Sequence, residues 1–365
     1  MERIAGGAAA LLISTTLAQA GALDRTGQPV TVIFEDGNYA ELSFALTDPD
    51  VEGEVAGLSS GDVGEGFSLA ALSFKYDLGE RLSLGIVIEE PFGADPDYTS
   101  TDPGYPLSGT EADFRSTSLT LLGRYRINDG FSVHGGLRHV TVDADLRVST
   151  ATLGGPAVYE AEYDPDSGLG YVLGGAYERE AIALRVALTY SSEVELDNET
   201  DFTLDPPGPA VLPGSGTTSY TLPQSVNLDL RTGIAPGTAL IGGVRWVDWS
   251  ETEIVSPGYF ANPVVDYDGD YVTYTLGVGR QLTDGLRGVA SIVYEGPIGG
   301  TTSNLSPFDG QTALVLGATY ALGNGFELTG GLRYARLGDA TTQLVGAEFE
   351  DNTSTSLALR VAYRF

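Results

Sequence analysis

Arginine side chains at alternate positions within apolar segments are the residues of this sequence best suited to bind a ligand. Arg185, for example, stands between Leu184 and Val186. A guanidinium binds a carboxylate through two parallel hydrogen bonds, so such a residue could hold the head group of an acidic ligand. Six arginines follow this pattern: Arg185, Arg231, Arg245, Arg287, Arg333 and Arg360.

Two interpretations of these arginines stay open. Acidic residues on the same faces, such as Asp229 and Glu327, could neutralise them, or one or two of them could anchor a ligand. Arg185 is our ligand-binding candidate from the six. Arg138 and Arg147 are added to it because they belong to a segment whose alternation breaks near His139.

Catalytic chemistry has little support in the sequence. There is no cysteine, and the two histidines, His134 and His139, have no serine beside them that would suggest a nucleophile and its base. We therefore expect a protein that is not an enzyme, with no catalytic residue, no cofactor and no dedicated metal site.

The elements that must position these arginines are β-strands. Apolar residues recur at every second position in many segments, and the chain ends on such a run, from Leu357 to the terminal Phe365. Period-2 alternation indicates strands with one apolar and one polar face. One such strand alone would also fit the edge of a soluble sandwich, but the repetition along the chain favours a barrel with lipid outside and polar residues inside.

The connections between these segments alternate between short and long. Six short ones, such as 127–130 and 322–325, are built from Gly, Asn, Asp or Pro, which are typical of tight turns. The seven long ones are 50–65, 91–113, 149–167, 197–220, 254–268, 299–309 and 342–351. The sequence therefore predicts an all-β fold, an antiparallel transmembrane β-barrel of about fourteen strands with a short N-terminal luminal segment.

The two ends of the chain support export to the bacterial outer membrane. Residues 4–17 are mostly small and apolar, and Ala18-Gln19-Ala20 resembles a cleavage site, so residues 1–20 are predicted to be a signal peptide. Residues 21–38 would form a hatch-like segment and 39–365 a barrel that crosses the membrane many times. The formal net charge of −31 argues against nucleic acid as a partner. Acidic loops could simply be solvated, or could hold divalent cations against lipopolysaccharide.

A break in the third predicted strand is the most specific local feature. Alternation is regular up to Ile88 and is then interrupted by Glu89, Glu90, Pro91, Phe92 and Gly93. Continuing the strand would place a glutamate in lipid, and proline cannot donate to the ladder. Either the strand ends here, or a kink opens the wall sideways and lets an apolar ligand leave into the bilayer.

Four stretches together resemble the FadL/TodX family of outer-membrane transporters for long-chain fatty acids and other hydrophobic compounds. They are Gln28-Pro29-Val30 with the residues that follow, the break at 85–93, Leu188-Thr189-Tyr190-Ser191-Ser192-Glu193-Val194, and Trp246-Val247-Asp248-Trp249-Ser250. The resemblance implies a monomeric fourteen-stranded barrel with a luminal hatch, a luminal pocket and lateral exit at the third strand. Gln28 and Val30 stand where the family has Asn and Ala, and most of the hatch is missing.

The resulting prediction is passive transport of hydrophobic molecules, either long-chain fatty acids or neutral hydrocarbons and aromatics. An acidic mouth disfavours free carboxylates, which gives neutral ligands comparable weight. A small polar-solute porin and a structural or surface-recognition barrel are the alternatives. Lateral exit would make residues 89–93 a gate, and Gln28, Pro29 and Val30 part of the hatch.

Overall fold

The computed structural model describes residues 22–150, 157–206, 211–259 and 263–365. The predicted signal peptide lies outside these ranges. In the described part of the chain, three 3-10 turns are present: η1 (Thr31–Phe34), η2 (Glu180–Ile182) and η3 (Trp249–Glu251). None of the described helices is long and apolar enough to cross a membrane.

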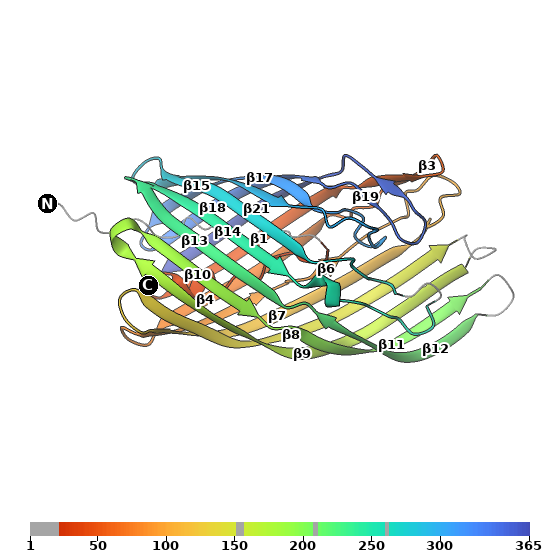
Figure 1. The fold of residues 1–365 in the computed structure, drawn as a ribbon, viewed down its shortest axis with the longest axis horizontal. Helices are drawn as coiled ribbons and strands as arrows, with labels where there is room; N and C mark the ends of the chain where they lie inside the picture. The colour runs from red at the N-terminus through yellow and green to blue at the C-terminus, as the bar shows by residue number, and fades with distance from the viewer. Residues whose placement is uncertain (1–21, 151–156, 207–210, 260–262) are drawn as a thin grey trace.

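The chain forms a closed antiparallel barrel (Figure 1). Its main sheet has seventeen strand segments, and because three strands are interrupted once, these make fourteen passages along the wall. In order they are β1 (Tyr39–Asp50), β4 (Phe67–Asp77), β5 (Leu82–Glu89) with β6 (Gly93–Ala94), β7 (Glu111–Arg126), β8 (Phe131–Thr150), β9 (Ala157–Arg179), β10 (Leu184–Ser191) with β11 (Val194–Asp205), β12 (Leu212–Leu222) with β13 (Ser225–Ala235), β14 (Thr238–Val247), β15 (Tyr271–Gln281), β16 (Leu286–Glu295), β17 (Gln311–Gly323), β18 (Phe326–Leu337) and β21 (Thr353–Arg364). Pairing of β1 with β21 closes the barrel and confirms the predicted fold.

The strands have the two faces that their alternation predicts. Along β1, Leu42, Phe44 and Leu46 point outward and are 41–61% exposed, while Ser43 and Ala45 between them are buried. Outward aromatic side chains gather near the short turns: Tyr76, Tyr125, Phe131, Tyr177, Tyr320, Phe326 and Phe365. A second group lies further along the strands: Tyr171, Tyr274, Tyr294 and Tyr334. An apolar band between two aromatic girdles is the pattern of outer-membrane barrels.

The two ends of the barrel differ. Short turns gather at one end, shown at the left of Figure 1, and the longer connections at the other. A membrane-spanning strand needs about 9–11 residues, whereas β8 has 20 and β9 has 23, so part of each extends beyond the membrane at the loop end. A small sheet of β2 (Glu52–Val55), β3 (Leu58–Asp62), β19 (Ala340–Thr341) and β20 (Glu348–Phe349) covers part of this end.

Two predicted loops are wrong in extent. Much of 149–167 and of 197–220 is strand, because β8, β9, β11 and β12 continue into these ranges. Outside a membrane both faces of a strand can be polar, as in β11 around Asp197 and Asn198, so the apolar alternation that marks a strand is lost there.

The N-terminal segment, residues 22–38, lies inside the barrel. Val32, Ile33 and Phe34 of η1 are buried at the short-turn end. The Phe34 ring packs edge-on against His134, with 5.3 Å between ring centroids. Lys75 of β4 donates to the carbonyl of Gly37 at 2.8 Å, which fixes the point where the segment joins the wall. Apolar side chains of the segment therefore fill this end of the lumen.

Candidate ligand pathway and wall opening

The wall of the barrel is interrupted between β4 and β5, one of the places in the described chain where the ladder between neighbouring strands stops. The ladder between these strands ends at the pair Leu72 and Ile88, and contact resumes at a single bridge between Gly64 and Pro96. Between these points, residues 65–71 and 89–95 form no ladder pair with one another. We call this interval the wall opening. The strand break that the sequence predicts after Ile88 is one edge of it.

The segment after Glu89 turns into the lumen because its backbone finds partners there. Pro91 has no N–H for the ladder. The N–H of Phe92 donates to Oγ of Ser116 on β7 at 2.8 Å, and that hydroxyl donates back to the Phe92 carbonyl at 2.7 Å. Phe92 is 3% exposed and packs edge-on against Trp249, with 5.9 Å between centroids. The Ser116 side chain thus takes the place of a backbone ladder contact between β7 and the segment that joins β5 to β6.

The N-terminal segment pairs with this inward turn. The N–H of Arg25 donates to the Pro91 carbonyl at 2.8 Å, and the N–H of Gly93 donates to the Leu23 carbonyl at 2.9 Å. These bonds flank an antiparallel bridge between Asp24 and Phe92. The backbone of the kinked strand is therefore satisfied by a short ribbon inside the barrel instead of by β4.

A buried polar cluster holds the segment beside the kink. The guanidinium of Arg138 donates to Oε1 of Gln28, and Oγ1 of Thr26 donates to Oε2 of Glu89 at 2.7 Å. Arg245 donates to the carboxylate of Asp24 at 2.7 Å. The structure thus brings together Gln28, Glu89 and Arg138, three of the predicted site residues, although they are far apart in the sequence.

The remaining predicted hatch and gate residues lie around this cluster. Val30 is buried with η1 in the apolar filling of the short-turn end, and Pro29 beside it is half-buried. Glu90 faces the β4 side of the opening, where its carboxylate accepts from the N–H of Ala70 at 3.4 Å. Gly93 begins β6, which pairs with β7.

Two candidate arginines lie elsewhere. The alternation of β8 does not break at His139. The His139 side chain faces outward and that of Arg138 faces inward. Arg147 is an odd number of residues after Arg138 and therefore lies on the outward face. Arg147 forms an ion pair with Glu160 outside the lumen. Arg185 is buried in the lumen near the short-turn end, with its guanidinium 4.9 Å from the centre of the Phe34 ring.

Most of the inward-facing arginines have acidic or amide partners. Arg287 pairs with Glu327, as one of the two interpretations expects, and Arg360 pairs with Glu41 at 3.4 Å. Arg333 donates to the amide oxygen of Gln311. Among the described residues, Asp229 forms no ion pair. These arginines are therefore paired with side chains of the lumen itself, as the first interpretation expects.

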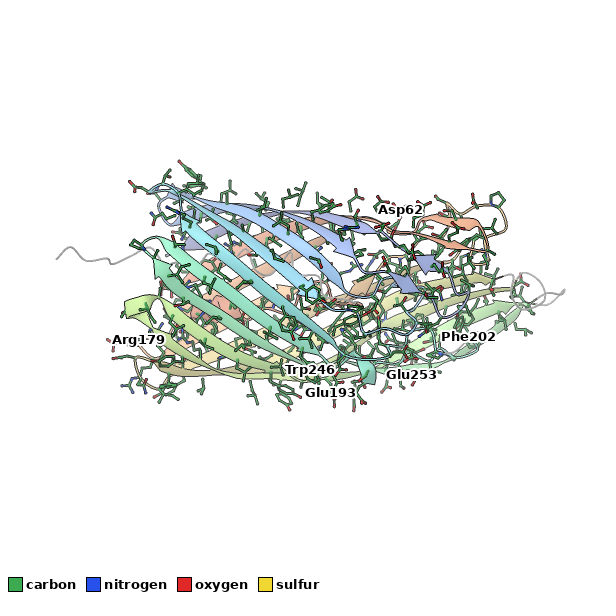
Figure 2. All side chains as sticks on the ribbon, turned by 45° about the horizontal axis from the view of Figure 1, so that its top comes forward. Asp62, Arg179, Glu193, Phe202, Trp246 and Glu253 are labelled. Carbon is green, nitrogen blue, oxygen red and sulfur yellow. The ribbon has the colours of Figure 1, made fainter. Side chains whose placement is uncertain are left out.

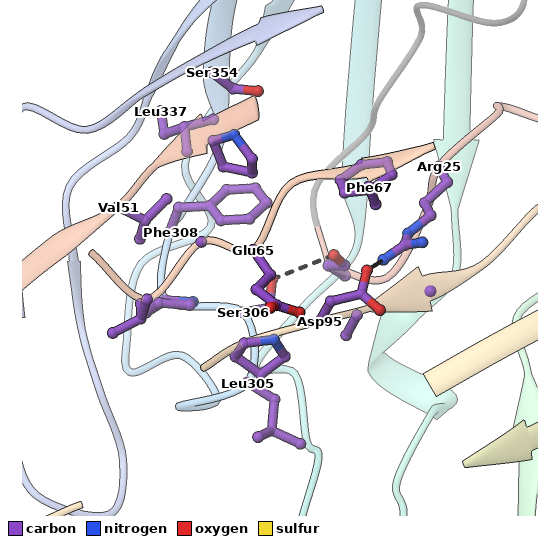
Figure 3. Close-up of a pocket in the computed structure, with 18 of the residues that line it drawn as sticks. Arg25, Val51, Glu65, Phe67, Asp95, Leu305, Ser306, Phe308, Leu337 and Ser354 are labelled. Atoms are coloured by element: carbon purple, nitrogen blue, oxygen red, sulfur yellow. Dashed lines mark hydrogen bonds and ion pairs between the residues drawn. The ribbon is translucent and has the colours of Figure 1, made fainter. Parts of the chain in front are cut away.

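Arg25 is the residue of the opening that our sequence reasoning missed. Its guanidinium pairs with the carboxylate of Asp95 and lies 4.0 Å from the centre of the Phe67 ring (Figure 3). Arg25 is the one basic residue between positions 21 and 38, which is the only signal the sequence offers. Its position depends on contacts with residues some 40 to 70 positions away.

Two cavities lie inside the barrel near the opening. The gate cavity, about 100 Å³, adjoins Arg25, Phe67 and Asp95 (Figure 3). The apolar cavity, about 40 Å³, is lined mainly by apolar and tyrosine side chains, and Asp145 is the one charged residue among its described lining. Ala94 and Leu305 line both cavities. The two cavities are therefore neighbours that share these two lining residues.

Loops from the outer end close over the cavities. The hydroxyl of Tyr98 donates to the carbonyl of Asn304 at 2.6 Å, which ties two loops together above Leu305. Tyr98 and Tyr105 stack with 6.1 Å between centroids. Burial raises the pKa of Tyr105 to about 12 and that of Tyr98 well above its usual value, so both phenols stay neutral. These two tyrosines therefore add no charge to the loops at this end.

The two tyrosine- and tryptophan-containing motifs support the wall. The hydroxyl of Tyr190 donates to Gln224 at 2.9 Å, and the Gln224 amide donates to Asp248 at 2.7 Å. The indole N–H of Trp246 donates to Asp270 at 3.0 Å. These residues lie where β10/β11 and β12/β13 are interrupted, and Trp246 sits on the outside of the barrel (Figure 2). The motifs join neighbouring strands where their ladders stop.

The described ranges contain no group of three or more histidine or acidic residues placed to hold a metal ion.

Comparisons with known proteins agree with this geometry. The profile of the family described as "Outer membrane protein transport protein (OMPP1/FadL/TodX)" matches residues 31–361. A Pseudomonas aeruginosa FadL homologue has a similar structure, with a TM-score of 0.75, 15% identity and coverage of 92% of each chain. The toluene transporter TodX of Pseudomonas putida gives a TM-score of 0.71 at 13% identity, covering 96% of this chain and 100% of its own. For the CymD monoaromatic hydrocarbon channel the TM-score is 0.65 at 15% identity, with 93% and 94% covered. A comparison with curated protein sequences finds no match.

Proposed function

Because the chain belongs to the OMPP1/FadL/TodX family of outer membrane transport proteins, we propose that it carries small neutral hydrophobic molecules passively across the bacterial outer membrane. The observation that supports this most directly is an apolar luminal cavity beside an interruption of the wall. Such a barrel needs no catalytic group, because its ligand is bound, guided and released without chemical change.

The route we propose runs through the two cavities. A ligand captured under the outer loops enters the apolar cavity, passes Ala94 and Leu305 into the gate cavity, and leaves through the wall opening into the bilayer. A cavity of about 150 Å³ binds benzene in an engineered protein. The gate cavity, about 100 Å³, is smaller than that, so a ring-sized ligand requires side chains along the route to move.

Neutral ligands fit this route better than fatty acids. The described lining of the apolar cavity contains no cation that could hold a carboxylate. The arginines nearest the route are engaged: Arg25 with Asp95, and Arg245 with Asp24. A chain with a net charge of −31 also repels anions from its mouth. The toluene transporter TodX and the CymD monoaromatic hydrocarbon channel share the fold, which supports aromatic hydrocarbons as the ligand class.

A porin is the weaker alternative. A polar-solute porin needs a continuous water-filled bore, whereas Val32, Ile33 and Phe34 fill the short-turn end of this lumen. A barrel that acts only through surface recognition would not need an apolar cavity beside an open seam. For the protein in its membrane we propose a monomer with its long-loop end facing the lipopolysaccharide, where divalent cations would bridge the acidic loops.

The test is uptake of radiolabelled toluene and oleate by cells that lack their own hydrophobic transporter and produce this protein. We expect accelerated uptake of toluene and little change for oleate. Oleate uptake at a comparable rate would contradict the assignment to neutral ligands and would indicate that the protein transports fatty acids. Acceleration of neither compound, with the barrel correctly inserted, would contradict the proposed function.

A further inference from the structure

The side chain of Arg25 lies in the wall opening, beside the gate cavity. We propose that Arg25 is the plug of this opening, and that its guanidinium must leave Phe67 and Asp95 before a ligand can pass from the gate cavity into the bilayer. This inference rests on the proposed function, because it assigns a residue to the exit step of the same route.

The contacts of the guanidinium bridge both edges of the opening. On the β4 edge, its central carbon lies 4.0 Å from the centre of the Phe67 ring. On the other edge, it forms an ion pair with Asp95, which follows β6 (Figure 3). Residues 67 and 95 belong to the two sides that the missing ladder would otherwise join. This side chain thus joins the two edges where the ladder is missing, as the bond from the Ala70 N–H to the Glu90 carboxylate does elsewhere in the opening.

Gly93 leaves the plug its space. A Cβ atom added at Gly93 would lie 2.4 Å from the Arg25 Nε and Cζ atoms, closer than any normal contact. The guanidinium therefore lies directly against the backbone of β6, with no side chain between them. Arg25 is only 8% exposed, so the side chain is buried between the two edges.

The plug is a long side chain on a backbone that hydrogen bonds hold in place. The backbone of Arg25 is held by the bond from its N–H to the Pro91 carbonyl, and the next bond joins Gly93 to Leu23. The side chain beyond it is long and is held only by the ring and the carboxylate. Rotation of that side chain would clear the opening without moving the N-terminal segment, and side-chain rotations are fast compared with movements of whole segments.

Arginine has a shape suited to this place. Its planar guanidinium can lie flat on an aromatic ring while its N–H groups donate to a carboxylate, which the compact ammonium of lysine does less well. The pair with Asp95 also neutralises the charge of the guanidinium.

The experiment measures access to the opening from the lipid side. The chain has no cysteine, so Ala94→Cys creates a unique thiol in β6, at a residue that lines both cavities. In liposomes, this thiol is labelled either with a lipid-soluble maleimide or with a charged, water-soluble maleimide. Adding Arg25→Ala should speed labelling by the lipid-soluble reagent about tenfold or more, because the rate follows the open population. Labelling by the charged reagent should not change.

Arg245→Ala is the matched control in the same Ala94→Cys background. Arg245 also pairs with the N-terminal segment, but its ion pair is with Asp24 and not with either edge of the wall opening. Its removal should leave labelling by the lipid-soluble reagent unchanged. Equal acceleration by both variants would mean that loosening of the N-terminal segment causes the effect, and it would overturn the proposal that Arg25 is the plug. Equal labelling rates with and without Arg25 would overturn it as well.

Two controls distinguish loss of the plug from a folding defect. One is a second variant, and the other is electrophoresis without heating, in which folded barrels migrate differently from unfolded ones. Asp95→Asn keeps Arg25 but removes its ionic partner, and should give an intermediate rate. The proposed function is judged separately, by toluene uptake of the unmodified protein. Uptake without an effect of Arg25→Ala on labelling would reject the plug alone, and absence of uptake would reject the function whatever the labelling shows.

Discussion

At the scale of single residues, the lumen is organised by pairing of charges. Arg25, Arg245 and Arg287 each have a carboxylate partner on a different segment of the chain. An unpaired charge inside a protein is costly, whereas a paired and hydrogen-bonded one is tolerated. Charge pairing therefore leaves the route near the wall opening without a free cation, which is why we assign it to neutral ligands.

Gly93 allows a test of the opening that leaves every charge in place. Gly93→Ala should push the Arg25 guanidinium off Phe67, because the new methyl group would lie 2.4 Å from its Cζ atom. The clash is with the far end of a flexible side chain, so the barrel should still fold. We expect faster toluene uptake than in the unmodified protein, measured as the initial rate in cells.

Gly330→Ala is the matched control for that variant. Gly330 lies in β18, and a methyl group there would meet no atom within 4 Å. Its uptake should equal that of the unmodified protein. If Gly93→Ala also leaves the rate unchanged, Arg25 does not limit the exit of the ligand.

At the scale of elements, the strands and their faces could be predicted from the sequence, and the course of the N-terminal segment could not. Alternation and tight turns are local signals, so they give the strand count and the break after Ile88. The inward course of residues 22–38 depends on distant partners, such as Arg245 for Asp24 and Arg138 for Gln28. No local pattern announces such contacts.

The same reasoning explains the candidates that lie elsewhere. The sequence pattern predicts a break in the alternation near His139 and therefore groups Arg147 with Arg138. In the structure β8 is continuous, so the two arginines face opposite sides of the wall. Strand register decides which face each residue takes, and a mistake of one residue reverses the assignment.

The element η1 is predicted to keep the barrel from conducting ions. The Phe34 ring lies between two guanidiniums, 4.6 Å from that of Arg124 and 4.9 Å from that of Arg185. Phe34→Ala should open a wet passage there and give a steady current in planar bilayers, where the unmodified protein gives none. Phe44→Ala, at an outward-facing position, should stay silent. A silent Phe34→Ala barrel would show that other residues close the lumen.

At the scale of the whole molecule, the fold combines a lumen that is filled at the short-turn end with an interrupted ladder in the wall. Apolar side chains fill the short-turn end, and tyrosine-rich loops cover the outer end. Between them, two small cavities lead to the interval where β4 and β5 are unpaired. On the route that we propose, a hydrophobic molecule would not need to enter the water beyond the short turns, because it would leave into the bilayer.

The measurement that tests this account most directly is toluene uptake by a barrel whose third strand has been straightened. Glu90→Thr with Pro91→Val supplies the missing N–H donor and removes the acid that lipid would exclude, so residues 89–95 could return to the ladder with β4. Glu80→Thr with Pro236→Val makes the same replacements in two exposed short turns and serves as the control. The account predicts that uptake falls to the level of cells without the protein in the first variant only. Full uptake by a correctly folded, straightened barrel would contradict exit through the wall.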